Sequence, residues 1–214
     1  MTDDSRTPLS RGQLDVLTRV FHQGAAEASV ALEKWLRLPS LMTIDAVDQV
    51  PLSDATTTLG TDAEPVCFCS MRMDGQLSGQ LIFVFDENSG LMLADFVLGR
   101  AHTPSDRAWG EVETSAALET ANVIGCAYLN ALQRHLPGGK DTVGLIPSPP
   151  QFERDYPEAL LQFSLMSQLM ASDTVFLAQS RFHVDGTQLD WTLLLVPDGA
   201  SVEKLSQLMQ SESA

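Results

Sequence analysis

The sequence predicts an α+β protein in which helices accompany an antiparallel sheet. Three observations lead to this fold class. Stretches with apolar residues at every third or fourth position, typical of helices, alternate with shorter strand-like stretches. The strands occur in runs between the helices, which favours antiparallel pairing. The order helix, strand, hairpin, helix occurs twice with a period on the order of one hundred residues, which indicates two pseudo-two-fold related halves sharing one sheet.

The first half opens with a helix that is predicted to begin near Ser10. Ser10 and Gln13 have the spacing of a capping box. Leu9 and Leu14 have the spacing of the hydrophobic staple that commonly accompanies it. Apolar residues then predict one buried stripe, which Pro39 ends. The stripe consists of Leu14, Leu17, Phe21, Ala25, Ala28, Leu32 and Trp35.

The second half opens with another long helix. Its start is predicted at Thr103, as the cap, with Pro104 in the first turn. The helix is expected to run to about Leu136, where Pro137-Gly138-Gly139 ends it. Further helices are expected over about 89–98, 156–170 and 200–210.

Strands are expected at corresponding places in both halves. They cover about residues 41–50, 66–73 and 78–85, and then about 142–147, 174–184 and 188–196. Asp74-Gly75 and Asp185-Gly186 predict turns between neighbouring strands. The proline-rich stretch 146–157 is expected to be either an irregular connector or a rim beside a site. No Pro/Ser-rich linker divides the halves, so a single domain is predicted over 1–214, with repeats at about 10–100 and 103–211.

Composition excludes several classes of function. The formal net charge of −15 and the pI near 4.4 argue against binding to nucleic acid or to an anionic membrane, because both need clustered Lys and Arg. Hydrophobic residues make up 44% and charged residues 19% of the chain, which indicates a globular protein. No signal peptide or apolar run of about 20 residues is present. An odd number of cysteines suggests a reducing compartment, so a cytoplasmic location is expected.

Familiar catalytic motifs are absent from the sequence. It has no phosphate-binding P-loop, no strand-linked G-x-G-x-x-G, no G-x-S-x-G and no H-E-x-x-H. Cys67 and Cys69 lie two apart on an expected strand and could form half of a metal site. The histidines are scattered, however, and none is near these cysteines in the sequence. We therefore expect no metal on this chain.

A short polar row on the second long helix is the strongest candidate for a functional site. At about 100° per residue, Ser115, Glu119 and Asn122 fall near 0°, 40° and 340° on a helical wheel. The row borders the apolar stripe without entering it. On its own, such a row is most simply the solvated edge of an amphipathic helix.

The context of this row resembles a known family. The stretch from Ser115 to Leu132 resembles the signature helix of the CheC/CheX/FliY phosphatases of bacterial chemotaxis. That motif has Asp or Ser, then Glu, Asn and finally a proline. Here the proline is Pro147, two residues later than the motif has it, and the turn before it could absorb the insertion. The duplicated order of elements also agrees with the CheC-like fold.

The same alignment identifies a degenerate first site. Asp15 matches the motif, but Arg19 stands where Glu is expected and His22 where Asn is expected. Asp45 occupies the position of the proline. An arginine cannot replace a carboxylate that pairs with a cation, so the resemblance implies a chain with one remaining site.

The function implied by the resemblance is removal of the phosphoryl group from the aspartate of a response regulator such as CheY. The regulator would supply Mg²⁺ and a lysine, and this chain would need no cofactor. Glu119 would pair with that lysine, and Asn122 would hold the attacking water.

Three alternatives remain open from the sequence. The chain could bind a response regulator or a CheD-like protein without turnover. It could be a structural part of the flagellar switch, although the short sequence after the last expected helix provides no additional switch domain. It could also be an unrelated globular domain.

Overall fold

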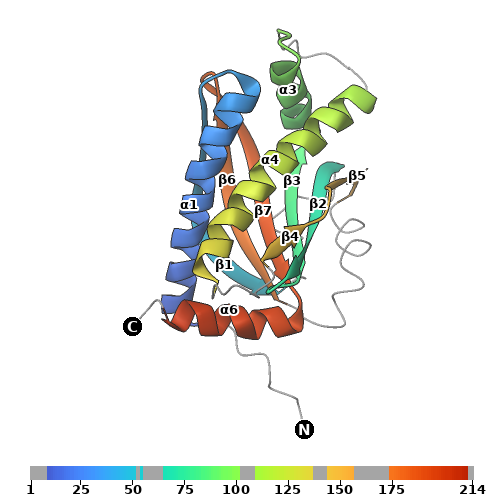
Figure 1. Ribbon diagram of the computed structural model, residues 1–214. Helices are drawn as coiled ribbons and strands as arrows, with labels where there is room; N and C mark the ends of the chain where they lie inside the picture. Colours follow the sequence, from blue (N-terminus) through green and yellow to red (C-terminus); the bar gives the residue numbers. More distant parts are fainter. Residues whose placement is uncertain are drawn as a thin grey trace.

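The computed structural model describes residues 9–51, 54, 65–101, 109–136, 144–156 and 174–211. These residues form four helices and a seven-stranded antiparallel sheet (Figure 1), which confirms the predicted α+β class. The helices are α1 (Arg11–Leu36), α3 (Glu87–Val97), α4 (Glu111–His135) and α6 (Gly199–Ser211). The strands are β1 (Ser40–Pro51), β2 (Val66–Gly75), β3 (Gly79–Asp86), β4 (Leu145–Pro147), β5 (Gln151–Asp155), β6 (Thr174–Val184) and β7 (Thr187–Pro197).

The sheet interlocks the two halves of the chain. Its order is β1-β6-β7-β3-β2-β4, and β5 also pairs with β2. The first strand of the first half therefore pairs with a strand of the second half, and β4 and β5 pair with a strand of the first half. This order agrees with a duplicated chain, although the duplication itself stays a prediction.

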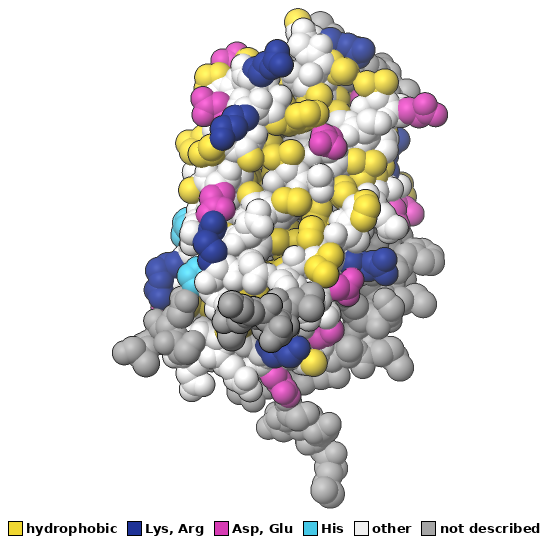
Figure 2. Space-filling model, in the orientation of Figure 1, with side chains coloured by type: hydrophobic (Ala, Val, Ile, Leu, Met, Phe, Trp, Pro, Cys, Tyr) yellow, Lys and Arg dark blue, Asp and Glu magenta, His cyan; other side chains and the backbone are white. Residues whose placement is uncertain are grey.

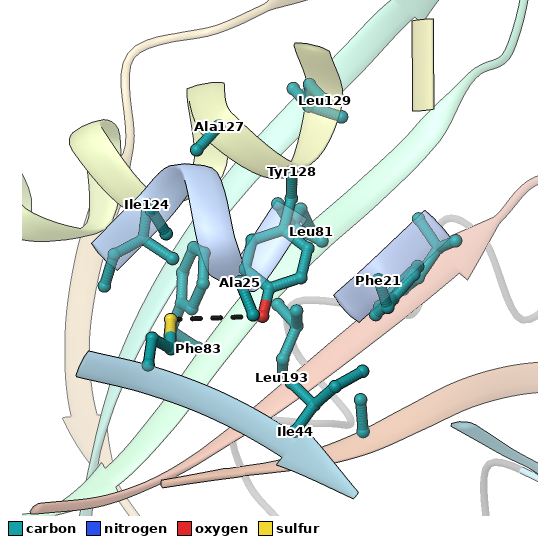
Figure 3. Packing of buried hydrophobic residues seen from close by; sticks show 14 of the residues in the cluster. Phe21, Ala25, Ile44, Leu81, Phe83, Ile124, Ala127, Tyr128, Leu129 and Leu193 are labelled. Atoms are coloured by element: carbon teal, nitrogen blue, oxygen red, sulfur yellow. Dashed lines mark hydrogen bonds between the residues drawn. The ribbon is translucent and has the colours of Figure 1, made fainter. Parts of the chain in front are cut away.

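The two long helices cover one face of the sheet, where the main core lies (Figure 1). They cross at Tyr128 of α4, whose ring packs edge-to-face on Phe21 of α1 with centroids 5.4 Å apart. Gly24 makes this close approach possible, because a Cβ at this position would lie 2.6 Å from Cδ1 of Tyr128. Figure 3 shows Tyr128 pointing between α1 and the sheet, with its hydroxyl 3.9 Å from Sδ of Met42.

The start of α1 agrees with the sequence, but its last turn does not. The backbone N–H of Ser10 donates to Oε1 of Gln13 at 2.7 Å, and the N–H of Gln13 donates to Oγ of Ser10 at 3.4 Å, so the capping box is confirmed. Trp35, predicted in the buried stripe, is 40% exposed, whereas Leu36 is 7% exposed. In a helix, the next buried residue after Leu32 can be either three or four positions later. Packing buries Leu36, four positions later, and leaves Trp35 on the surface.

The predicted start of the second long helix is wrong. The helix begins at Glu111, and Gly110, with φ −128° and ψ −172°, is its N-cap. The N–H of Gly110 donates to Oε2 of Glu113 at 3.2 Å, and Trp109 before it lies outside the helix. Thr103, Pro104 and the Pro137 turn lie outside the described residues.

Strand β5 was not expected. It forms within the proline-rich stretch 146–157 and pairs with β2 from Ser70–Gln151 to Val66–Asp155. The sequence signal is weak because β5 is a charged edge strand with little apolar alternation. The helix predicted over 156–170 falls almost entirely outside the described residues.

The remaining strands agree closely with the sequence. The turn at Asp185-Gly186 joins β6 to β7, and Asp74-Gly75 lies at the turn between β2 and β3, where Gly75 has φ 115°. A second apolar cluster lies on the other sheet face and consists of Phe68, Ile82, Val84, Val175, Leu177, Leu194 and Val196. Within the described parts of the chain, no helix is long and apolar enough to cross a membrane.

Candidate functional site

The candidate site lies on α4, which the sequence stabilises at both ends. Glu111 and Glu113 lie in its first turn, and Arg134 and His135 in its last, so both ends complement the helix dipole. Before the helix, Nε1 of Trp109 donates to Oγ1 of Thr114 at 2.8 Å. One side of α4 carries small apolar residues that pack into the core, and the row of polar residues runs along its margin.

The predicted row is accessible to a partner. Ser115 and Glu119 are exposed, and Asn122 is half-buried. The three positions span about 10 Å at 1.5 Å per residue. Between them, Ala116, Ala117, Thr120 and Ala121 are buried. A row of this kind can contact a second protein without disturbing the core.

Asn122 and Glu119 share their side of the helix with Cys126. The Cys126 thiol donates to Oδ1 of Asn122 over 3.8 Å. Burial raises the pKa of this thiol above its ordinary value, and the negative charge of Glu119 raises it further. Cys126 therefore keeps its proton at neutral pH beside the site. Among the described residues, no group accepts a hydrogen bond from the amide nitrogen of Asn122.

The face around the row is apolar with few charges. Figure 2 shows hydrophobic side chains in a band along and between α1 and α4. Val112, one turn before the row, is 48% exposed. An exposed carboxylate beside a half-buried amide in apolar surroundings forms a suitable contact for a protein that carries a complementary cation.

The predicted degenerate site occupies matching positions on α1. Residues 11–20 and 111–120 have the same succession of buried, half-buried and exposed positions. Asp15, Arg19 and His22 are all exposed and lie where α4 has Ser115, Glu119 and Asn122.

Asp45, the fourth residue of the degenerate site, has a partner on the sheet. It lies beside a β-bulge in β1, and its carboxylate binds Nη2 of Arg181 at 2.8 and 3.1 Å. The structure therefore shows matching exposed positions on α1 and α4, and the degenerate first site stays a prediction.

Pro147 ends β4, a three-residue edge strand beside β2. This strand is attached to α4 by Gln133, whose Oε1 accepts the N–H of Leu145. Sequence reasoning missed Gln133, and also missed the ring of Trp109 stacked on Phe152. Helical spacing could have identified Gln133 from the sequence, because it places this residue on the same side of α4 as Ser115.

Within the described ranges, no three His, Cys, Asp or Glu residues are grouped so that they could hold an ion. Cys67 and Cys69 are free, buried thiols on the core side of β2. Burial raises the pKa of Cys67 to about 12, and also raises the pKa of Cys69, so both remain protonated at neutral pH.

The fold is shared with the solved structures of FliY and FliM. The structure of FliY from Thermotoga maritima superposes with a TM-score of 0.78 over 95% of this chain and 98% of that one, at 15% identity. FliM in the FliM–SpeE complex from H. pylori gives a TM-score of 0.71 over 95% and 97%, at 14% identity. The chain therefore has the CheC-like fold.

A curated relative identifies the particular protein that the chain resembles. It is 22% identical over 196 residues to the CheY-P phosphatase CheC of Bacillus subtilis (strain 168), covering 90% of this chain and 91% of CheC. No family model matches the chain. The resemblance predicted from the sequence is confirmed.

Proposed function

We propose that this chain is a phosphatase that hydrolyses the aspartyl phosphate of a response regulator such as CheY. The observation that carries the proposal is the pair on α4 formed by the exposed Glu119 and the half-buried Asn122, in a chain that resembles CheY-P phosphatase CheC along nine-tenths of its length. The substrate would be a cytoplasmic signalling protein, and we place the enzyme in the same compartment.

The proposed mechanism needs little covalent chemistry from this chain. Water attacks the phosphorus atom, the bond between phosphorus and the aspartate oxygen breaks, and inorganic phosphate and a proton leave while the carboxylate is regenerated. Positioning and charge stabilisation dominate such phosphoryl transfers. The regulator would carry the Mg²⁺ and the lysine that neutralise the phosphoryl charge, so this chain would need no cofactor.

Glu119 and Asn122 have separate roles in this mechanism. The exposed carboxylate of Glu119 pairs with the regulator's lysine and docks α4 against the phosphorylation site. One turn further on, Asn122 enters that site. Its amide can accept one hydrogen bond and donate another, so it holds a water in line with the bond to be broken. In this proposal Ser115 would begin the contact surface, and Pro147, the last residue of β4, would border it.

The experiment that tests this proposal uses CheY phosphorylated with acetyl phosphate and Mg²⁺. The wild-type chain is expected to accelerate phosphate release, and Asn122→Ala is expected to reduce the acceleration by about 100-fold or more, because the water is no longer positioned. His22→Ala is the matched control at the same position of α1, and it is expected to retain full activity.

Two results would contradict the proposal in different ways. If the wild-type chain adds nothing to the intrinsic decay of CheY-P, the chain is not a CheY-P phosphatase. If Asn122→Ala retains wild-type activity, the phosphatase reaction stands but its assignment to α4 is wrong.

The second candidate function is a non-catalytic binding module for a response regulator or a CheD-like protein. The observation that favours it is the likeness to FliM, which is described in complexes with SpeE and with FliG. In that case the wild-type chain would bind CheY-P or CheD in a pull-down experiment and leave the phosphoryl group in place.

A further inference from the structure

The segment Leu145–Phe152, here called the proline strap, is not explained by the fold alone. It contains β4, the sequence Pro147-Ser148-Pro149-Pro150 and the start of β5. Proline fixes φ near −65° and has no backbone N–H. The strap is therefore stiff, and its prolines cannot donate to an additional strand at this edge of the sheet.

One end of the strap is attached to α4 and the other to Trp109, which immediately precedes this helix. At the first end, the N–H of Leu145 donates to Oε1 of Gln133. A Cβ on the preceding Gly144 would lie 2.8 Å from the same oxygen, so the strap begins in close contact with this side chain. At the other end, the ring of Phe152 stacks on Trp109, with centroids 5.0 Å apart and planes 4° apart. The strap therefore runs antiparallel to α4.

The middle of the strap is attached to β2. The N–H of Ser148 donates to the carbonyl of Arg72 at 2.8 Å, and the N–H of Arg72 donates to Oγ of Ser148 at 3.0 Å. Between the pairs Met73–Pro147 and Ser70–Gln151, three strap residues oppose two residues of β2, which is the arrangement of a β-bulge. Hydrogen bonds therefore hold the prolines at one fixed place along the edge.

This geometry places the strap beside the polar row. From Glu111 to Gln133 the helix rises about 33 Å, and the strap extends at most about 23 Å from Leu145 to Phe152. The middle of the strap thus lies alongside the middle of α4, where Glu119 and Asn122 are found. Figure 1 shows β4 and β5 following one another along the edge of the sheet next to α4.

The attachment is also on the correct side of the helix. Gln133 comes about five full turns after Ser115, so it projects from the same side of α4 as the row. Leu145 and Phe152 both pack against the main core beneath α4. Pro147 alternates with Ile146 along β4 and therefore faces the α4 side of the sheet as Leu145 does.

We propose that the proline strap is a preformed rim that contacts the regulator's receiver domain when this domain docks on α4, and that Gln133 is the positioning residue that holds the rim in place. The inference rests on the proposed phosphatase function. A rim that is rigid before binding avoids the entropy cost of ordering it in the complex. Loosening it weakens docking and leaves the chemistry at Asn122 unchanged.

The test compares Gln133→Ala with Gln133→Glu, using CheY-P for turnover and beryllofluoride-activated CheY for binding. Gln133→Ala removes the acceptor for Leu145, and KM and Kd are expected to rise about three- to tenfold while kcat stays unchanged. Gln133→Glu keeps an acceptor oxygen and is expected to restore both constants. Glu33→Ala, the matching position on α1, is the control and is expected to change neither.

Ser148→Ala provides an independent variant, because it loosens the strap at β2 and should raise KM and Kd in the same direction. If the wild-type chain releases phosphate and Gln133→Ala leaves both constants unchanged, the rim proposal fails and the phosphatase function stands. If both Gln133 variants lower the melting temperature and kcat equally, Gln133 is only structural. If the wild-type chain is inactive and does not bind, the proposed function itself fails.

Discussion

At the scale of single residues, the candidate site consists of two side chains in different surroundings. Glu119 is exposed, whereas Asn122 is half-buried and its amide oxygen is already in contact with the Cys126 thiol. This contact favours the amide orientation in which the nitrogen points away from Cys126. The residue proposed to position water is thus oriented by its own helix, and the residue proposed to dock remains free to adjust to a partner.

Glu119→Gln is expected to separate docking from chemistry. The substitution keeps the shape of the side chain and removes the charge that attracts a lysine, so KM for CheY-P should rise about tenfold, while kcat changes little. The salt dependence of KM should also decrease, because screening acts on charges. The measurement is initial-rate kinetics at low and high ionic strength. A large fall in kcat with KM unchanged would assign Glu119 to the reaction step instead.

At the scale of elements, the close crossing of α1 and α4 fixes where the site lies above the sheet. Gly24→Ala is expected to destabilise the protein by about 1–3 kcal/mol, because the new Cβ would overlap the ring of Tyr128 and lie 3.1 Å from its Cα. Gly12→Ala on the same helix is the control. A Cβ there meets nothing within 4 Å and should stabilise the helix by up to about 1 kcal/mol.

Urea unfolding of the two glycine variants measures this difference. Equal stabilities would show that the helices separate easily at the crossing, and the placement of α4 would then depend mainly on its contacts with the sheet.

The predicted degenerate site on α1 leads to a prediction that a working polar row can be rebuilt on this helix. Arg19→Glu combined with His22→Asn, made in the Asn122→Ala chain, should recreate the polar row on a helix with the same pattern of exposure. Phosphate release from CheY-P is expected to recover by about tenfold over Asn122→Ala alone. Absence of any recovery would indicate that the surroundings of α1, including the Asp45–Arg181 ion pair, no longer admit a regulator.

At the scale of the whole molecule, buried thiol and phenol groups make the free energy of unfolding depend on pH in the alkaline range. Burial raises the pKa of Cys67 from 9.0 to about 12 and raises the pKa of Cys69 and Tyr128 above their ordinary values. These groups keep their protons longer in the folded state than in the unfolded chain. Their contribution is therefore complete below about pH 9 and decreases as the pH rises through the folded values.

Unfolding in urea from about pH 8 to about pH 11 measures this loss. The free energy of unfolding should fall with rising pH, and the slope should be shallower when Cys67 and Cys69 are both replaced by Ala. An unchanged slope in that variant would assign the effect to Tyr128.

Local sequence signals predicted much of the fold and the place of the site. Pattern and spacing were sufficient to predict features that depend on neighbouring residues. These are the capping box at Ser10, the turn at Asp185-Gly186 and the first and last residues of β6. The exposed row on α4 likewise followed from helical periodicity. Its role as a site remains a proposal that rests on the resemblance to CheC.

Other features could not be predicted because they depend on contacts between distant segments. Trp109 leaves the helical path to stack on Phe152, so the helix begins at Glu111 and not near Thr103. Strand β5 forms because β2 offers it a free edge, although its own residues carry little strand signal.

By itself, the sequence determined the class of fold, the order of its elements and the polar face of the second long helix, because periodicity and turn chemistry act over a few residues. Only the tertiary structure decided that α1 and α4 cross at Gly24 and Tyr128, and that the proline strap lies along α4. These contacts join residues far apart in the chain, and their free energy comes from packing and hydrogen bonds that no local pattern specifies.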